Sequence, residues 1–337
     1  MIKSCYIHIP FCKKICSYCD FCKNYYNELV VDGYLDNLKK EISKNSFRLL
    51  NKTKMAPYVF ILPAFILLIM FNIYPLISSF YISTLDMKVS FDTAKFVGLD
   101  NFKAILSDAR FFNSLKVTLL FTAIEVPAQM IIGLIMSAIL KENTFWNKVF
   151  RSIYFIPVVC SSTAIGIMFQ IILHSNIGIV SYWLKLLGFG KVNLLNTPGL
   201  TLIVVVLVSV WRSFGISTVI LISAMQNVPV SYYEASELDG AGKIRQFFSI
   251  TLPNIMPSFW FLLMTRVIGS LQVFDLIFML TDGGPNHTTE TLVTYVYERA
   301  FDMGNRMGYA TAMSEFLFLI IMVITIIQYI IMVKTEN

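Results

Sequence analysis

Six long apolar segments constrain the fold of this chain most strongly. Each is long enough to cross the hydrocarbon core of a bilayer as a helix, which takes about 17–25 residues. The chain is 56% hydrophobic and 14% charged, whereas soluble domains carry about 25% charged residues. The segments lie near residues 56–82, 113–140, 152–174, 199–225, 254–281 and 313–333. The sequence therefore predicts an all-α membrane protein with six transmembrane helices.

An even number of spans places both termini on the same side of the membrane. Basic residues beside a first span mark the cytoplasmic side, and ten of the 27 lysine and arginine residues precede Met55. We therefore expect a multi-pass protein with both termini in the cytoplasm. This basic flank explains much of the net charge of +6, so the charge does not call for a nucleic-acid partner.

A charged segment separates the fourth and fifth spans. It runs from Glu234 to Gly240, and nine residues later the chain reads Ile-Thr-Leu-Pro and ends this stretch at Pro253. Ser231 and Glu234 fit a capping box at the start of a short helix. Gly240 is placed to end that helix in a left-handed conformation, and Pro253 is expected to stop a second helix. The sequence thus predicts a compact knob outside the bilayer, within a loop over residues 226–253.

This segment resembles the EAA loop of binding-protein-dependent ABC importer permeases. The family pattern is E-A-A, three residues, G, nine residues, I-x-L-P, and here Ser236 stands in place of the second alanine. Other motifs resemble the sugar and glycerol-phosphate branch of that family. They are Phe96–Phe102, Phe150–Pro157, Trp211–Gly215, Leu271–Asp275 and Thr281–Pro285. Together the similar stretches cover roughly residues 55–333.

The resemblance implies that residues 46–337 form the permease subunit of an ABC importer in the bacterial inner membrane. Such a subunit moves a sugar or related solute and is not itself an enzyme. Implied partners are a second permease, cytoplasmic ATPase subunits that hydrolyse ATP, an extracellular solute-binding protein and membrane lipid, and no cofactor is required in this chain. The implied ATPase-coupling residues are Glu234, Ala235, Ser236, Gly240, Ile250, Leu252 and Pro253. Segments 83–112 and 282–312 are expected to dock the binding protein.

Polar side chains inside the spans are candidates for the solute path, because exposing them to lipid is costly. They are Glu125, Gln129, Gln170, Arg212, Arg266, Gln272, Asp275 and Glu315. Amides and carboxylates bind sugars, so we expect Gln170, Gln272 and Asp275 to line that path. Hydrogen bonding between helices is the alternative for every one of these residues, and we favour it most for Arg212 and Arg266.

Residues 1–45 carry an unrelated pattern. Cys12, Cys16 and Cys19 have C-x3-C-x2-C spacing, and their surroundings resemble the start of radical SAM proteins similar to oxygen-independent coproporphyrinogen oxidase. In those proteins the three cysteines bind a [4Fe–4S] cluster. A single strand–helix unit cannot bury a core or enclose a cofactor, so we expect a truncated leader with a vestigial metal motif. Two alternatives remain, namely a membrane-tethered radical SAM or iron–sulfur protein, and an artefactual chimera of two genes. The greater extent of the similarity to permeases favours the importer.

Overall fold

The computed structural model describes residues 11–12, 24–25, 32–37, 39–40, 58–88, 94–302 and 306–336. It divides into two compact units, residues 1–76 and residues 77–337. In the first unit, β1 (Phe11–Cys12) pairs in parallel with β2 (Asn24–Tyr25), and residues 32–37 are helical. The division between the units falls within the first apolar helix, whereas the sequence motifs change near residue 45.

The first apolar helix runs from Tyr58 to Ser83, close to the predicted span at 56–82. It contains a π-helical turn, η1 (Ile69–Ile73), followed by α2 (Tyr74–Ser83). This turn ends directly before Tyr74, the first residue of α2, and Pro75 is the second residue of that helix. Proline has no N–H for a regular helical hydrogen bond, and the wider turn lets the helix continue through that position.

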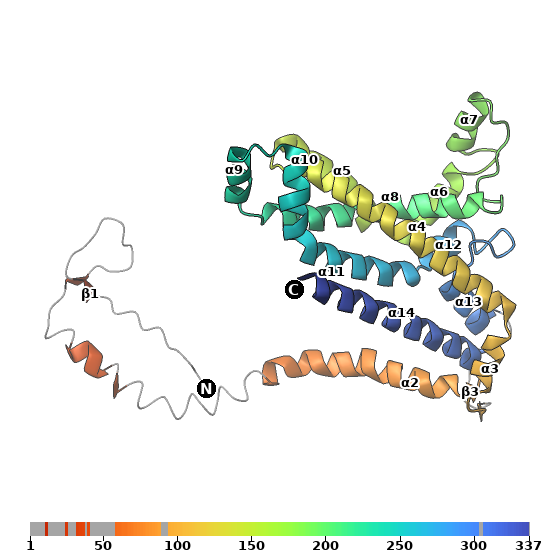
Figure 1. Ribbon diagram of the computed structural model, residues 1–337. Coiled ribbons are helices and arrows are strands. Elements are labelled where there is room, and N and C mark those ends of the chain that lie inside the picture. The colour runs from red at the N-terminus through yellow and green to blue at the C-terminus, as the bar shows by residue number, and fades with distance from the viewer. Residues whose placement is uncertain are drawn as a thin grey trace. The chain divides into compact units, whose positions relative to one another are not determined.

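Unit 2 is built almost entirely from helices (Figure 1). Its long helices are α4 (Ala109–Leu140), α8 (Leu200–Gln226), α11 (Leu252–Leu271) and α14 (Met307–Glu336). Shorter elements connect them, namely β3 (Leu85–Asp86), β4 (Lys95–Phe96), α3 (Asp100–Leu106), α5 (Phe145–Val159), α6 (Ser162–Ile172), α7 (Ile179–Leu186), α9 (Val230–Leu238), α10 (Lys243–Gln246), η3 (Phe247–Thr251), α12 (Asp275–Leu280), α13 (Leu292–Tyr297) and η4 (Glu298–Asp302). Among the described residues, five helices are long and apolar enough to cross a membrane, or six if α5 and α6 form one broken span.

The third predicted span, 152–174, is not a single straight helix. Its two halves, α5 and α6, meet at an angle of 97°, because Cys160 between them has an extended backbone with φ −74° and ψ 144°. The halves pack against different neighbours, α5 against α8 and α6 against α12. Hydrophobicity alone predicts one continuous span here, but tertiary packing divides it into two helices.

The fifth predicted span, 254–281, also differs at its end. Helix α11 ends at Leu271, and a new helix, α12, begins at Asp275. The break leaves the carbonyl of Val273 outside regular helix, and the hydroxyl of Thr291 donates a hydrogen bond to it at 3.0 Å. A distant side chain therefore stabilises the interruption.

The centre of unit 2 is the packing of α4 against α8, with α11 against both. Gly133 on α4 permits the close approach, since a Cβ atom there would lie 2.9 Å from the Cβ atom of Ser217 on α8. Gly215 likewise permits the close approach of α8 to α5, because a Cβ atom there would clash with the carbonyl oxygen of Tyr154. Small residues at helix crossings are typical of membrane proteins, in which close packing replaces the hydrophobic effect.

Candidate functional site

The segment that resembles an EAA loop forms a knob at one end of α8, which we call the coupling knob (residues 226–253; Figure 1). Helix α9 ends in a Schellman motif. The N–H of Ala241 donates to the carbonyl of Ser236 at 2.9 Å, and the N–H of Gly240 donates to that of Glu237 at 3.0 Å. Gly240 has φ +76°, so the predicted left-handed glycine at the end of this helix is confirmed.

Side chains join the two halves of the coupling knob. The amide of Gln246 on α10 donates to the hydroxyl of Ser236 on α9 at 3.0 Å, and that hydroxyl donates to the carbonyl of Tyr233 at 2.8 Å. The hydroxyl of Tyr233 lies 2.9 Å from that of Thr251. Ser236, the one departure from the family pattern, is therefore part of the connection between the two helices.

The capping box predicted at Ser231 and Glu234 is wrong. Helix α9 begins at Val230, with Pro229 at the N-cap and no side-chain hydrogen bond to the cap. Ser231 thus lies inside the first turn, and Glu234 is exposed. Proline at the cap orients the chain through its fixed φ angle, which replaces the expected side-chain bond.

The predicted helix stop at Pro253 is also wrong. The chain stays helical from Lys243 to Leu271, and Pro253 lies in the first turn of α11. The π-helical turn η3 ends two residues before this proline, as η1 ends two residues before Pro75, and it accommodates the missing N–H in the same way. Ile250 and Leu252 beside it pack against the core formed by α4, α8 and α11.

The coupling knob exposes two large apolar side chains among its charged ones. Leu238 on α9 is 91% exposed, and Ile244 on α10 is 77% exposed. Ala235 is exposed too. These side chains flank the bend at Gly240 and present an apolar surface on a segment whose backbone is fixed. Apolar groups held in this way are typical of a docking surface.

A polar cavity of about 230 Å³ lies between α4, α8 and α11. Glu125, only 3% exposed, accepts hydrogen bonds from Gln129 at 2.9 Å and from Ser209 at 3.3 Å. Arg212 and Arg266 line the same cavity. Their Nε atoms are buried without a hydrogen-bond partner among the described residues.

Glu125, Gln129, Arg212 and Arg266 were each candidates from the sequence, but their grouping was not predicted, and Ser209 was not a candidate. A usable signal was present in their spacing. Glu125 and Gln129 are four residues apart, as are Ser209 and Ser213, and Arg266 and Ser270. Residues with this spacing share one face of a helix, so three predicted spans each carry a polar face.

The three predicted path residues lie elsewhere on the chain. Gln170 lies on α6 and lines a different cavity of about 330 Å³ with His174 and Asp282. Gln272 lies in the break after α11, and Asp275 is the first residue of α12. All three side chains are exposed, and their role in a solute path stays a prediction.

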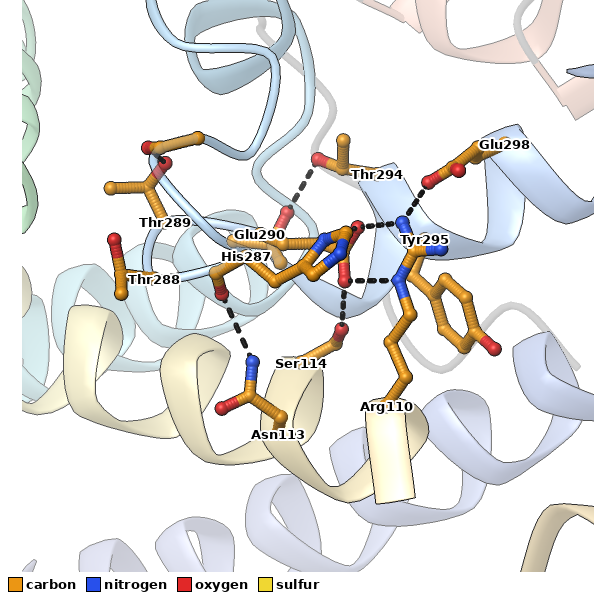
Figure 2. A network of polar contacts seen from close by, with 12 residues as sticks. Arg110, Asn113, Ser114, His287, Thr288, Thr289, Glu290, Thr294, Tyr295 and Glu298 are labelled. Carbon is orange, nitrogen blue, oxygen red and sulfur yellow. Dashed lines mark hydrogen bonds and ion pairs between the residues drawn. The ribbon is translucent and has the colours of Figure 1, made fainter. Parts of the chain in front are cut away.

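The opposite end of unit 2 holds a buried network of charges (Figure 2). Glu290 is only 2% exposed. It accepts hydrogen bonds from the Nε and Nη2 atoms of Arg110 at 3.0 and 2.5 Å, and from Ser114 at 2.9 Å. Arg110 also pairs with Glu298, and the Nδ1 atom of His287 lies 3.1 Å from Glu290. The network fastens the start of α4 to the segment between α12 and α13.

A third carboxylate, Asp108, extends this network. Asp108 caps α4 by accepting hydrogen bonds from the N–H groups of Arg110 and Phe111. It also accepts from the hydroxyls of Tyr295 at 2.6 Å and Tyr309 at 2.7 Å. Burial opposes ionisation of Asp108, but these hydrogen bonds together hold its pKa below the usual value. Burial, and then the bond to Asp108, raise the pKa of Tyr295 to about 12.

The cysteine motif of the leader lies outside this description. Cys16 and Cys19 are not among the described residues, and the structure describes the backbone of Cys12 but not its side chain. The expectation that this metal motif is vestigial therefore stays a prediction.

Known proteins support the resemblance over most of the chain. Residues 129–335 match the family model of the binding-protein-dependent transport system inner membrane component. The chain is 31% identical over 284 residues to the probable ABC transporter permease protein YurN of Bacillus subtilis, covering 83% of this chain and 97% of that protein. It is 33% identical over 271 residues to the trehalose/maltose transport system permease protein MalF of Thermococcus litoralis, covering 80% and 91%.

The fold is also that of a solved importer. A bacterial ABC transporter involved in the import of the acidic polysaccharide alginate contains a chain that superposes with a TM-score of 0.74. The two are 21% identical, and the match covers 89% of this chain and all of that one. The apolar helices and the family match together show that this chain belongs to the binding-protein-dependent transport system inner membrane component family and is a multi-pass permease subunit of an ABC importer.

Proposed function

We propose that this permease carries a carbohydrate or a related polar solute, with ATP hydrolysed on partner subunits. The observation that carries the proposal is the polar cavity between α4, α8 and α11, where amide, hydroxyl, carboxylate and guanidinium groups meet within otherwise apolar helices. Such groups supply the donors and acceptors that a hydroxyl-rich solute needs. The names of the relatives, which include a trehalose/maltose permease and an alginate importer, support the same solute class. Disaccharides, oligosaccharides and glycerol phosphate are the candidates.

The coupling knob is the proposed contact with the ATPase subunits. Leu238 and Ile244 would enter an apolar cleft on the ATPase, while Ala235 permits close approach. Because Ser236 and Gln246 join α9 to α10, a movement of the ATPase would be transmitted to α8 and α11 as a rigid-body rotation. This assignment places the knob, and with it both termini, in the cytoplasm.

The remaining partners occupy the other surfaces. The solute-binding protein would dock on segments 83–112 and 282–312, which Arg110 and Glu290 hold together. A second permease would cover part of the exposed apolar surface of the long helices. The truncated leader, residues 1–45, would add neither radical chemistry nor a contribution to transport.

The experiment is ATP-driven uptake into proteoliposomes that contain the permease with its partner permease, ATPase and binding protein. Replacing Leu238 and Ile244 with serine should abolish uptake and uncouple the ATPase. The matched control is Leu187→Ser, which alters an exposed leucine directly after α7, outside both proposed docking segments, and should leave uptake intact. Uptake of amino acids but of no carbohydrate or glycerol phosphate would contradict the proposed solute class.

A further inference from the structure

The segment between α6 and α8 carries a surface that transport does not explain. Helix α7 (Ile179–Leu186) lies at the end of α8 that is remote from α9 (Figure 1). Its inner side chains, Val180 and Leu184, pack against the core formed by α4, α6, α8 and α12. These two residues are four apart, so they share one face and fix the helix to unit 2.

The outer face of α7 is apolar and aromatic. Ile179, Tyr182, Trp183 and Leu186 are all exposed, Trp183 to 58%. Tyrosine and tryptophan are enriched where a helix meets the interface between lipid and water. An apolar face of this kind, next to the ends of two spanning segments, fits the headgroup boundary of a bilayer.

A pocket of about 520 Å³ lies beside this helix. Its polar lining includes Ser175, Asn176, Ser181, Lys185 and Lys191. Ser181 is only 8% exposed, and its buried hydroxyl has no hydrogen-bond partner among the described residues. A buried polar group without a partner is unusual and costly, and this one lies in the wall of the pocket.

The charged side chains that line the pocket are both lysines. The sequence contains no aspartate or glutamate between Glu142 and Glu234, whereas Lys185 and Lys191 both line the pocket. Two ammonium groups with hydroxyl and amide donors match a phosphate group. The neighbouring apolar face distinguishes a lipid from a free phosphate, because only a lipid also brings acyl chains.

We propose that this pocket binds the anionic headgroup of a membrane phospholipid. The phosphate lies between Lys185 and Lys191 and accepts a hydrogen bond from Ser181, while the acyl chains lie along Tyr182 and Trp183. The bound lipid holds α7 at the membrane surface. This site does not depend on which solute the permease carries.

The test uses the full chain in nanodiscs, with Trp146, Trp211 and Trp260 replaced by phenylalanine. The tryptophan fluorescence then comes from Trp183 alone. Brominated phosphatidylglycerol should quench its fluorescence at a lower mole fraction than brominated phosphatidylcholine. Each lysine contributes about five-fold to this preference. The K185Q/K191Q variant should therefore abolish it, and S181A should weaken it.

The control is Lys103→Gln, which removes an exposed lysine that is already paired with Asp100 at 3.1 Å, and the preference should persist. Equal quenching by the two lipids in the unsubstituted protein would overturn the proposal, as would a preference that survives K185Q/K191Q. Loss of the preference when millimolar inorganic phosphate is added would assign the pocket to a soluble anion and overturn the lipid assignment.

Discussion

The two ends of unit 2 are built in opposite ways. At the α13 end, a carboxylate with 2% exposure, Glu290, is surrounded by Arg110, Ser114 and His287. At the α9 end, the leucine at the tip of the coupling knob is 91% exposed. One end buries charge, and the other exposes apolar surface.

The difference shows two ways in which a costly group is compensated, namely by partners inside the fold or by burial against another surface. A buried charge must find its partners within the fold, because an unpaired one is strongly destabilising. An exposed apolar side chain on a fixed backbone gains its burial only when another surface covers it. The buried charges of the α13 end are therefore paired within this chain, whereas Leu238 at the α9 end would be buried only against a partner.

Replacing Gly240 with valine should have the largest effect. A β-branched residue at φ +76° costs about 1–3 kcal/mol, which would disrupt the Schellman motif and change the positions of Leu238 and Ile244 on either side of it. We expect ATP-driven uptake in proteoliposomes to fall by about ten-fold or more, with normal insertion into the membrane.

Gly188→Val is the matched control for that substitution. Gly188 has φ +89° and open space around it, but it lies after α7, remote from the coupling knob. Uptake should stay near the level of the unsubstituted protein. Normal uptake by the Gly240→Val protein would show that the knob is not the coupling element.

Arg110→Ala tests the fastening at the α13 end. The substitution leaves Glu290 buried without its main counter-charge, so the free energy of unfolding should fall by about 3–5 kcal/mol. Chemical denaturation in detergent, followed by tryptophan fluorescence, measures this loss. Lys103→Ala breaks an ion pair whose partners are 75% and 70% exposed, and it should change stability by less than about 1 kcal/mol. Equal losses in the two variants would remove the distinction between buried and exposed charge.

The pH dependence of stability gives a smaller effect at the same end. The folded pKa of Asp108 is below its unfolded value, so its contribution is complete above about pH 4 and is lost as the pH falls through the folded pKa. The pKa of Tyr295 is raised to about 12, so its contribution is present below about pH 10 and is lost as the pH rises from there. In the Asp108→Asn protein, the free energy of unfolding should therefore fall less as the pH is lowered below about 4.

Asp100→Asn provides the comparison, because it changes an exposed carboxylate on α3. In this variant, the free energy of unfolding should fall at acid pH as it does in the unsubstituted protein. If it falls in the same way in the Asp108→Asn protein, the bonds from Tyr295 and Tyr309 do not stabilise the carboxylate.

Deleting residues 1–45 should have the smallest effect of all. Transport should be unchanged provided that Arg48, Lys52 and Lys54 remain as the basic flank of the first span. Uptake by the truncated importer measures this directly. Loss of uptake, or cleavage of S-adenosylmethionine by the full chain after cluster reconstitution, would show that the leader is not vestigial.

The sequence by itself determined the features that depend on local chemistry. Long apolar segments predict membrane helices because the cost of unpaired backbone groups in lipid leaves few other structures. Gly240 could be identified as a left-handed residue because glycine alone adopts that conformation without strain. The spacing around it was sufficient to indicate the family.

Only the tertiary structure decided the features that depend on distant partners. The bend between α5 and α6 follows from their packing on α8 and α12, and the end of α11 from the bond between Thr291 and Val273. The polar cavity joins residues as far apart as Glu125 and Arg266, and the pair of Arg110 and Glu290 spans 180 positions. Periodicity records which face of a helix is polar, but it does not record which other helix that face meets.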